Sequence, residues 1–224
     1  MKRSEINSII ASDKEFFAAH RFYLPEWAYW RPEEWKGKAS SCREIVEMQL
    51  GWDVTPFGSD DFHRRGLLLF TLRNGPSDGT GKQYAEKIMV VEEEQETPFH
   101  FHWAKREDII NRGGGNLVME FYGSTEEAGF ADSDITVRID GIPHTVAAGG
   151  AITLRPGQSV CLEPRVYHRF YGESGKGRVL TGEVSSVNDD EADNRFYEPI
   201  GRFPGVEEDE PPIHLLAIDY PQYL

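Results

Sequence analysis

Residues 97–115, TPFHFHWAKREDIINRGGG, place His100 and His102 two positions apart in an aromatic run that is typical of a strand. Because side chains alternate between the two faces of a strand, both imidazoles point the same way. Glu107 follows five positions after His102, an odd offset that requires a bulge or turn before its carboxylate can join them. The stretch therefore predicts either a metal site on a strand or two hydrogen-bonded imidazoles at an aromatic strand end.

The stretch lies within a series of short strand-like segments that begins at about Gly66. They are LLLFTLRNG, KIMVV, GNLVMEFYG, ITVRIDGIPHTV and AITLRPGQSVCL. The pair Asp140-Gly141, flanked by alternating apolar residues, predicts a β-hairpin with a two-residue turn. Many short strands without intervening helices favour a sandwich, jelly roll or barrel of antiparallel strands. We therefore expect a mainly β fold.

The two ends of the chain differ from this central region. Apolar residues at three- and four-residue spacing predict a helix over 4–20, and a shorter helix is expected over 41–50. Between them, YLPEWAYWRPEEWKG holds three tryptophans, which we expect to pack on the main domain or on a partner subunit. We predict one domain, residues 1–224, with a helical segment at 1–50, a barrel at 66–188 and an acidic, aromatic extension at 189–224 that wraps over the barrel.

The composition limits the partners of the protein. Its 224 residues include 38 acidic and 24 basic side chains, for a formal net charge of -14, which opposes binding to nucleic acid or anionic membranes. Cys42 and Cys161 are too few for a disulfide framework, and no apolar run is long enough for a signal peptide or a membrane span. We expect a cytoplasmic protein that binds neither nucleic acid nor membrane.

A later segment, CLEPRVYHRFYGESGKGRVLTGEVSSV (161–187), supplies another histidine, His168. If Gly175 and Lys176 form the two-residue turn of a hairpin, His168 lies directly opposite Glu183. This register predicts that a second carboxylate faces the histidines. A slip of one residue would turn it to the other face.

These residues resemble the two motifs of the cupin superfamily, a His-x-His followed by Glu and Gly, and then one further His. The matching positions are His100, His102, Glu107, Gly114 and His168. The first motif lacks its leading glycine, since position 94 is Glu94, and EPRVYH replaces the proline-glycine turn of the second. The resemblance implies a jelly-roll β-barrel in which His100, His102, Glu107 and His168 hold a metal ion.

Longer stretches resemble the bacterial D-lyxose isomerases in particular. They are YAEKIMVVEEEQETPFHFHWAKREDIINRGGGNL (84–117), SVNDDEADNRF (186–196) and RFPGVEEDEPPIHLL (202–216), together with the N-terminal FYLPEWAYW. This resemblance implies a sugar ketol-isomerase with Mn²⁺ as cofactor, although other divalent first-row ions also suit three imidazoles and a carboxylate. The implied reaction interconverts D-lyxose and D-xylulose, and also D-mannose and D-fructose, through a cis-enediol.

Four further residues receive expected roles in that chemistry. Glu183, facing the metal without binding it, is the candidate base for the carbon-bound proton, and Lys87 is the candidate donor to the sugar oxygen that develops charge. Asp193 and Arg195 are candidates for holding the distal hydroxyls. The alternatives are a solvated strand carboxylate for Glu183, an exposed edge charge for Lys87 and a solvated acidic run around Asp193.

Two other classes of function fit the same residues. A non-haem metal dioxygenase also uses three histidines and a glutamate around an open metal, and oxygen consumption would identify it. A sugar-binding cupin without turnover would bind a sugar and form no product. From the tryptophan-rich segment we expect a homodimer, while the preference among related sugars depends on atomic positions that a sequence does not specify.

Overall fold

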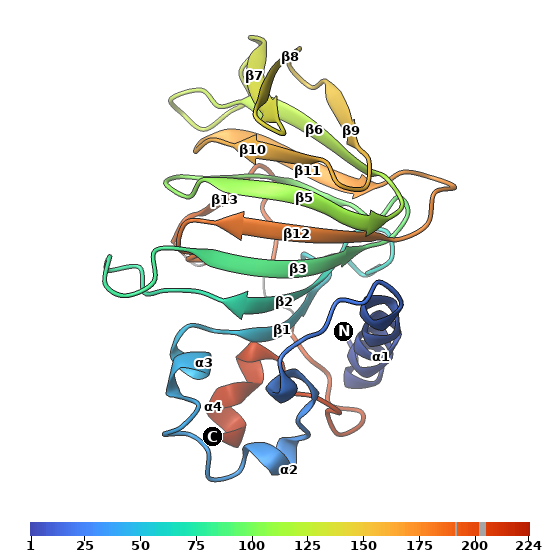
Figure 1. The fold of residues 1–224 in the computed structure, drawn as a ribbon, viewed down its shortest axis with the longest axis vertical. Helices are drawn as coiled ribbons and strands as arrows, with labels where there is room; N and C mark the ends of the chain where they lie inside the picture. The colour runs from blue at the N-terminus through green and yellow to red at the C-terminus, as the bar shows by residue number, and fades with distance from the viewer. Residues whose placement is uncertain (191, 202–204) are drawn as a thin grey trace.

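Two antiparallel β-sheets form the body of the computed structural model, which describes residues 1–190, 192–201 and 205–224 (Figure 1). The larger sheet contains, in spatial order, β1 (Gly51–Thr55), β2 (Leu67–Arg73), β3 (Ala85–Val91), β12 (Val179–Ser185), β5 (Glu107–Gly114), β10 (Ser159–Leu162), β7 (Ile135–Ile139) and β8 (Ile142–Val146). The smaller sheet contains β13 (Asn194–Phe196), β4 (Thr97–His102), β11 (Val166–Gly172), β6 (Leu117–Gly123) and β9 (Ala151–Leu154). The prediction of a mainly β fold is confirmed. Residue 191 and residues 202–204 of the predicted extension lie outside the described residues.

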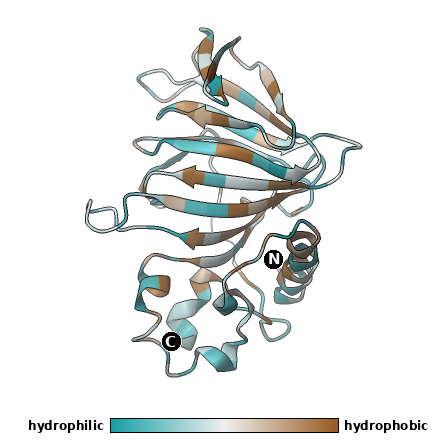
Figure 2. Ribbon diagram, in the orientation of Figure 1, coloured by the Kyte–Doolittle hydropathy of each residue, from teal (hydrophilic) through white to brown (hydrophobic). Residues whose placement is uncertain are grey.

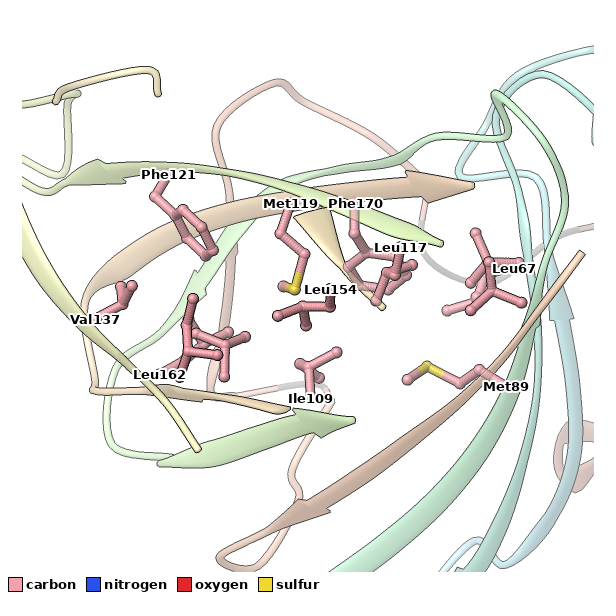
Figure 3. Packing of buried hydrophobic residues seen from close by; sticks show 14 of the residues in the cluster. Leu67, Met89, Ile109, Leu117, Met119, Phe121, Val137, Leu154, Leu162 and Phe170 are labelled. Atoms are coloured by element: carbon pink, nitrogen blue, oxygen red, sulfur yellow. The ribbon is translucent and has the colours of Figure 1, made fainter. Parts of the chain in front are cut away.

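The main core lies between the two sheets, where alternate side chains of each strand meet (Figure 3). Leu67 and Leu69 of β2, Met89 of β3, and Met119 and Phe121 of β6 belong to this core. The period of two is visible in Figure 2 as alternating hydrophobic and hydrophilic bands along the strands. Such alternation directs every second side chain of a strand into the core between the sheets.

A second core forms where the N-terminal helix packs on the outer face of the larger sheet. The helix α1 (Arg3–Ala19) buries Ile6, Ile10 and Phe17, and Phe17 stacks on Trp52 of β1 with ring centroids 6.1 Å apart. The helix expected over 4–20 is therefore confirmed. The one expected over 41–50 is shorter, α3 (Arg43–Glu47), and the remaining helical turns are η1 (Glu26–Tyr29), α2 (Pro32–Trp35), η2 (Ala217–Asp219) and α4 (Tyr220–Tyr223). No helix of the described residues is long and apolar enough to span a membrane.

The tryptophan-rich segment packs within the chain. Trp35 lies against Trp30 and Tyr220, each with ring centroids 5.1 Å apart, and Leu215 belongs to the same cluster. The C-terminal segment thus covers the aromatic surface that the sequence analysis assigned either to the main domain or to a partner. Both ends of the chain lie on the β1 side of the larger sheet, the N-terminus beside α1 and the C-terminus at α4 (Figure 1).

The predicted hairpin at Asp140-Gly141 is present. It joins β7 to β8, with Ile139 opposite Ile142, and both turn residues have positive φ, 50° for Asp140 and 82° for Gly141. This is the conformation of the tight turns that match the twist of two adjacent strands, and Asp-Gly adopts it at low cost.

The second predicted hairpin, with its turn at Gly175-Lys176, is wrong. Strand β11 pairs with β4 and β6, whereas β12 pairs with β3 and β5, so the segment between them crosses from one sheet to the other. A turn signal shows where the chain reverses but not which strands pair afterwards, and here the core between the sheets separates the two strands. The register that placed His168 opposite Glu183 therefore does not exist.

The larger sheet also begins earlier than the sequence indicated. Strand β1 pairs with β2, placing Trp52 opposite Phe70 and Val54 opposite Leu68. All four of these side chains are buried against α1 and its neighbours. The stretch GWDVT was not among the segments predicted as strands.

Candidate metal centre and active site

Three histidines converge on the inner face of the smaller sheet. His100 and His102 lie on β4, and His168 on the neighbouring strand β11 is the register partner of His100. One ring nitrogen from each of the three lies within 4.8 Å of the others. His102 and His168 are buried and His100 is partly buried, so the group is shielded from most of the solvent.

Backbone carbonyls fix two of the three rings. The Nδ1 atoms of His100 and His168 lie 2.8 Å and 3.0 Å from the carbonyl oxygens of Pro98 and Val166. A neutral imidazole that donates from Nδ1 presents the lone pair of Nε2, the arrangement found in most metal-binding histidines. Burial lowers the pKa of His100 well below its ordinary value and also lowers the pKa of His102, which favours the neutral form that binds metals.

Glu107 joins the histidines from the opposite sheet. The chain leaves β4 at His102, turns through the loop 103–106 and begins β5 at Glu107, so the required turn is present. Its Oε1 lies 3.0 Å from Nε2 of His168 and 3.5 Å from Nε2 of His102. Burial alone would raise the pKa of Glu107, but Lys105 and His102 hold it well below its usual range, so the carboxylate is ionised. The structure brings together the four residues predicted as metal ligands.

The hydrogen bonding of these atoms fits a cation. Among the described residues, Oε1 of Glu107, Nε2 of His168 and both ring nitrogens of His102 are buried and form no hydrogen bond. A buried polar atom without a partner costs free energy, and here several such atoms face one another. Imidazole nitrogens and a carboxylate oxygen are the donor set that first-row divalent ions prefer, so the residues present fit such an ion.

Lys105 is the residue that the sequence analysis missed. Its Nζ lies 2.8 Å from Oε2 of Glu107 and 2.8 Å from Oε1 of Glu183, with a side chain only 2% exposed. Burial lowers the pKa of Lys105, but these two carboxylates more than reverse the effect and raise it, so the side chain is an ammonium ion. The segment WAKRED contains Lys105 two positions before Glu107, but the alternation rule that placed the histidines does not extend into a loop.

Glu183 and Lys87 face the same cavity as register partners on neighbouring strands. Glu183 on β12 pairs with Lys87 on β3, and Nζ of Lys87 lies 3.7 Å from Oε1 of Glu183. Burial alone would raise the pKa of Glu183, but Lys105 and Lys87 lower it, so this carboxylate is ionised. Glu183 thus lies next to the histidine cluster through its pairing with β3 and β5, although the hairpin that suggested this position is absent.

Asp193 and Arg195 have contacts other than the expected ones. The carboxylate of Asp193 accepts hydrogen bonds from the backbone N–H groups of Ala104, at 2.8 Å, and Lys105, at 3.0 Å. It therefore holds the loop that carries Lys105. On β13, Asn194 and Phe196 line the cavity, so Arg195 between them lies on the other face, where its guanidinium donates to the carbonyl of Phe196. Their roles in binding a sugar stay predictions.

The cavity bounded by these groups is small. Its volume is about 40 Å³, enough for a few water molecules. It is lined by Phe57, Leu67, Leu69, Lys87, Met89, Thr97, His100, His102, Lys105, Glu107, Ile109, His168, Phe170, Glu183, Asp190, Asn194 and Phe196. A larger groove of about 440 Å³ adjoins it and shares Asp190 as a lining residue.

The fold and this cluster define a cupin-like sandwich whose inner face carries a three-histidine group able to hold a metal ion. Solved L-ribose isomerases share the fold. The enzyme from Cellulomonas parahominis, determined with L-ribose, has a TM-score of 0.63 at 14% identity over 92% of this chain and 98% of its own. The enzyme from Geodermatophilus obscurus has a TM-score of 0.53 at 16% identity over 82% of this chain and 98% of its own. The cupin-type fold predicted from the sequence is confirmed.

The sequence comparisons are more specific. A family model described as D-lyxose isomerase matches residues 1–220. The D-lyxose/D-mannose isomerases of Serratia proteamaculans and Escherichia coli O157:H7 are each 50% identical to this chain over the full length of both proteins. The chain belongs to the D-lyxose isomerase family and is a sugar isomerase, as its resemblance to that family predicted.

Proposed function

We propose that this chain interconverts D-lyxose and D-xylulose, and D-mannose and D-fructose, by moving a proton between C1 and C2 of the open-chain sugar. The observation that carries the proposal is the ionised carboxylate of Glu183, buried between Lys105, at 2.8 Å, and Lys87, at 3.7 Å, beside the histidine cluster. Relatives with 50% identity named for both sugars support it.

Glu183 is the proposed base. An ionised carboxylate in a cavity of low solvent content can accept the proton from C2 of the aldose and return it to C1 of the resulting enediol. The two lysines keep Glu183 ionised in the free enzyme, which a buried carboxylate would otherwise resist. One carboxylate thus serves both transfers, because C1 and C2 present their protons on the same side of a cis-enediol.

The proposed role of Lys87 and Lys105 is to donate hydrogen bonds to the sugar oxygens on C1 and C2, where negative charge develops as the carbonyl and hydroxyl exchange positions. Each ammonium carries three donors; Lys87 keeps donors for the substrate, whereas Lys105, which faces Glu107, Glu183 and Asn188, must exchange one of these partners to donate to a sugar oxygen. The proposed metal ligands are His100, His102, Glu107 and His168. Mn²⁺ bound there would supply Lewis acidity to the same pair of oxygens.

Two further proposals concern the distal end of the sugar and the assembly. Asp193 and Arg195 are proposed to contact the distal hydroxyls. Because Arg195 lies on the face of β13 opposite the cavity, this contact requires that the distal end of the sugar extend beyond the cavity, and a variant at each position tests it through the KM. A homodimer is also proposed. The tryptophan-rich segment packs against other parts of the same chain. Trp103 and Tyr197, however, are 43% and 44% exposed, and they provide an aromatic surface suited to contact with a partner subunit. Sedimentation velocity of the purified protein tests this assembly.

The decisive experiment removes the metal with a chelator, restores Mn²⁺ and follows D-lyxose and D-mannose by chromatography for D-xylulose and D-fructose. The Glu183→Gln variant keeps the shape of the site and removes the base. Ketose formation that needs the metal and disappears in this variant supports the proposal. The matched control, Glu163→Gln, changes an exposed carboxylate paired with Arg106 and should keep full activity.

Two results would contradict the proposal. If the Mn²⁺-loaded wild type left both sugars unchanged, the isomerase function on these substrates would be wrong, and oxygen uptake and sugar binding would be measured next. If Glu183→Gln retained the wild-type rate at full metal content, Glu183 would not be the base.

A further inference from the structure

Asn188 follows the end of β12 and lies between the two lysines of the site. Its Oδ1 accepts hydrogen bonds from Nζ of Lys87, at 2.7 Å, and from Nζ of Lys105, at 3.3 Å. Lys87 comes from β3 in the larger sheet, whereas Lys105 comes from the loop after β4 in the smaller sheet. One amide oxygen therefore sets the separation of two ammonium groups that arrive from different sheets.

Asn74 fixes the backbone of Asn188. The side-chain Nδ2 of Asn74 donates to the carbonyl of Asn188 at 2.9 Å, and the N–H of Asn188 donates to Oδ1 of Asn74, also at 2.9 Å. Asn74 directly follows β2 and is only 7% exposed. Because both hydrogen bonds of this pair use the backbone of Asn188, its side chain keeps its own oxygen for the lysines.

The second partner that the lysines share is Glu183, whose Oε1 lies 2.8 Å from Lys105 and 3.7 Å from Lys87. Lys105 also lies 2.8 Å from Oε2 of Glu107, and Lys87 lies 3.7 Å from Oδ1 of Asp190, so Asn188 is a neutral acceptor among carboxylates around the two ammonium groups. A neutral acceptor orients an ammonium without adding a further ion pair. Lys87 keeps donors for a ligand, whereas the three donors of Lys105 face Glu107, Glu183 and Asn188, and the 3.3 Å contact with Asn188 is the longest of the three.

We propose that Asn188, held in place by Asn74, is a positioning residue that sets Lys87 and Lys105 at the spacing needed to donate to two adjacent sugar oxygens in the transition state. This inference rests on the proposed function. Asn188 acts through the lysines, so its effect falls on the chemical step and not on metal binding. A positioning error of about 1 Å at such groups costs on the order of 100-fold in rate.

The experiment compares four variants with the wild type at full Mn²⁺ content. Asn188→Ala removes the spacer, and Asn188→Asp keeps its shape and oxygen but adds a charge. Asn74→Ala releases the backbone of Asn188. Asn116→Ala is the matched control. The side chain of Asn116 donates a hydrogen bond of 2.6 Å to Glu173, which lies in the turn after β11. The measurements are kcat and KM for D-lyxose, bound Mn²⁺ per chain and the midpoint of thermal unfolding.

The expected result for Asn188→Ala is a fall in kcat of about 10- to 100-fold, with KM and bound Mn²⁺ nearly unchanged. Asn188→Asp also loses kcat, because its carboxylate holds the lysine protons that the sugar oxygens need. Asn74→Ala loses less, and combining it with Asn188→Ala adds little further loss, because both changes disturb the same group. Asn116→Ala keeps the wild-type kcat.

Wild-type kcat in Asn188→Asp or Asn188→Ala would overturn the inference. A loss of kcat that matches a loss of bound Mn²⁺ would also overturn it, because Asn188 would then support the metal site and not the lysines. Asn188→Asp retains the volume of the side chain, so it tests the inference even if Asn188→Ala does not fold. Absence of turnover in the wild type would contradict the proposed function instead, which distinguishes the two failures.

Discussion

Oε1 of Glu107 lies 3.0 Å from Nε2 of His168, although Glu107 belongs to the larger sheet and His168 to the smaller one. A metal ion held by both residues would join the two sheets across the core. Metal binding at this position should therefore affect the stability of the whole sandwich, because the unfolded chain does not keep these atoms together.

The first prediction is that Mn²⁺ stabilises the protein against unfolding. At a free concentration of 100 times its Kd, the ion should raise the free energy of unfolding by about 2.7 kcal/mol. Urea unfolding in chelator and in graded Mn²⁺ measures this change. The His168→Gln variant should lose most of the increase, while His144→Gln, an exposed histidine on β8, should keep it. An equal increase in both variants would place the bound ion elsewhere.

The second prediction concerns the charge of Lys105. Replacing it by methionine leaves Glu107 and Glu183 buried without their shared cation, which should cost about 3–5 kcal/mol of stability in the metal-free protein. The comparison variant, Lys82→Met, breaks an exposed pair with Glu44 and should cost less than about 1 kcal/mol. Urea unfolding of both variants in chelator provides the test. Similar losses would show that Lys105 does not neutralise the two carboxylates.

The third prediction is a pH dependence set by Asp13. Burial raises the pKa of Asp13 to about 7 from 3.8, even though Arg178 lies 2.8 Å away and opposes the rise. In the unfolded chain this carboxyl ionises near its ordinary pKa, so between about pH 4 and 7 the folded state binds more protons. Stability must then fall as the pH rises through this window.

The variant Asp13→Asn has no titrating carboxyl at this position, so its free energy of unfolding lacks this pH dependence. Between pH 5 and 7 the free energy of unfolding should fall by about 2–3 kcal/mol more in the wild type than in the variant. Urea unfolding at half-unit pH intervals measures both curves. Parallel curves would show that Asp13 is already ionised in the folded protein at pH 5.

The fourth prediction concerns Arg3, whose guanidinium is 1% exposed and bonds to Asp219 and Glu208 at 2.8 Å and 2.6 Å. The change Arg3→Met leaves Asp219 buried without a cation and should cost about 3–5 kcal/mol. The exposed pair of Arg43 with Glu47 provides the control, since Arg43→Met should leave the midpoint of thermal unfolding nearly unchanged. Comparable midpoints of thermal unfolding for the two variants would contradict this role of Arg3.

Patterns that depend on the local geometry of the backbone were predictable from the sequence. The alternation of side chains along a strand placed His100 and His102 on one face, and a turn at Asp140-Gly141 followed from the positive φ that these residues tolerate. The helix α1 followed from its apolar spacing. Each of these inferences needs only the few residues that it names.

Features that depend on which strands pair were not predictable in the same way. The turn at Gly175-Lys176 was assigned to a hairpin because a turn signal carries no information about the sheet that the next strand enters. Lys105 and Asn188 lie in loops, where no period fixes the direction of a side chain. Their place in the site depends on contacts with Glu183, Lys87 and Asn74, which lie up to 114 residues away in the sequence.

The contacts of α1 also constrain the order in which the chain can fold during its synthesis. Besides Arg3, Asn7 donates to Glu210 at 2.7 Å, and Lys14 lies 2.7 Å from His214. The carboxylate of Glu208 is made 205 residues after Arg3. During synthesis, therefore, α1 leaves the ribosome long before the residues that complete its polar contacts have been added to the chain. The buried guanidinium can reach its native environment only after nearly the whole described chain has emerged, so these contacts cannot guide the folding of the segments that are made first.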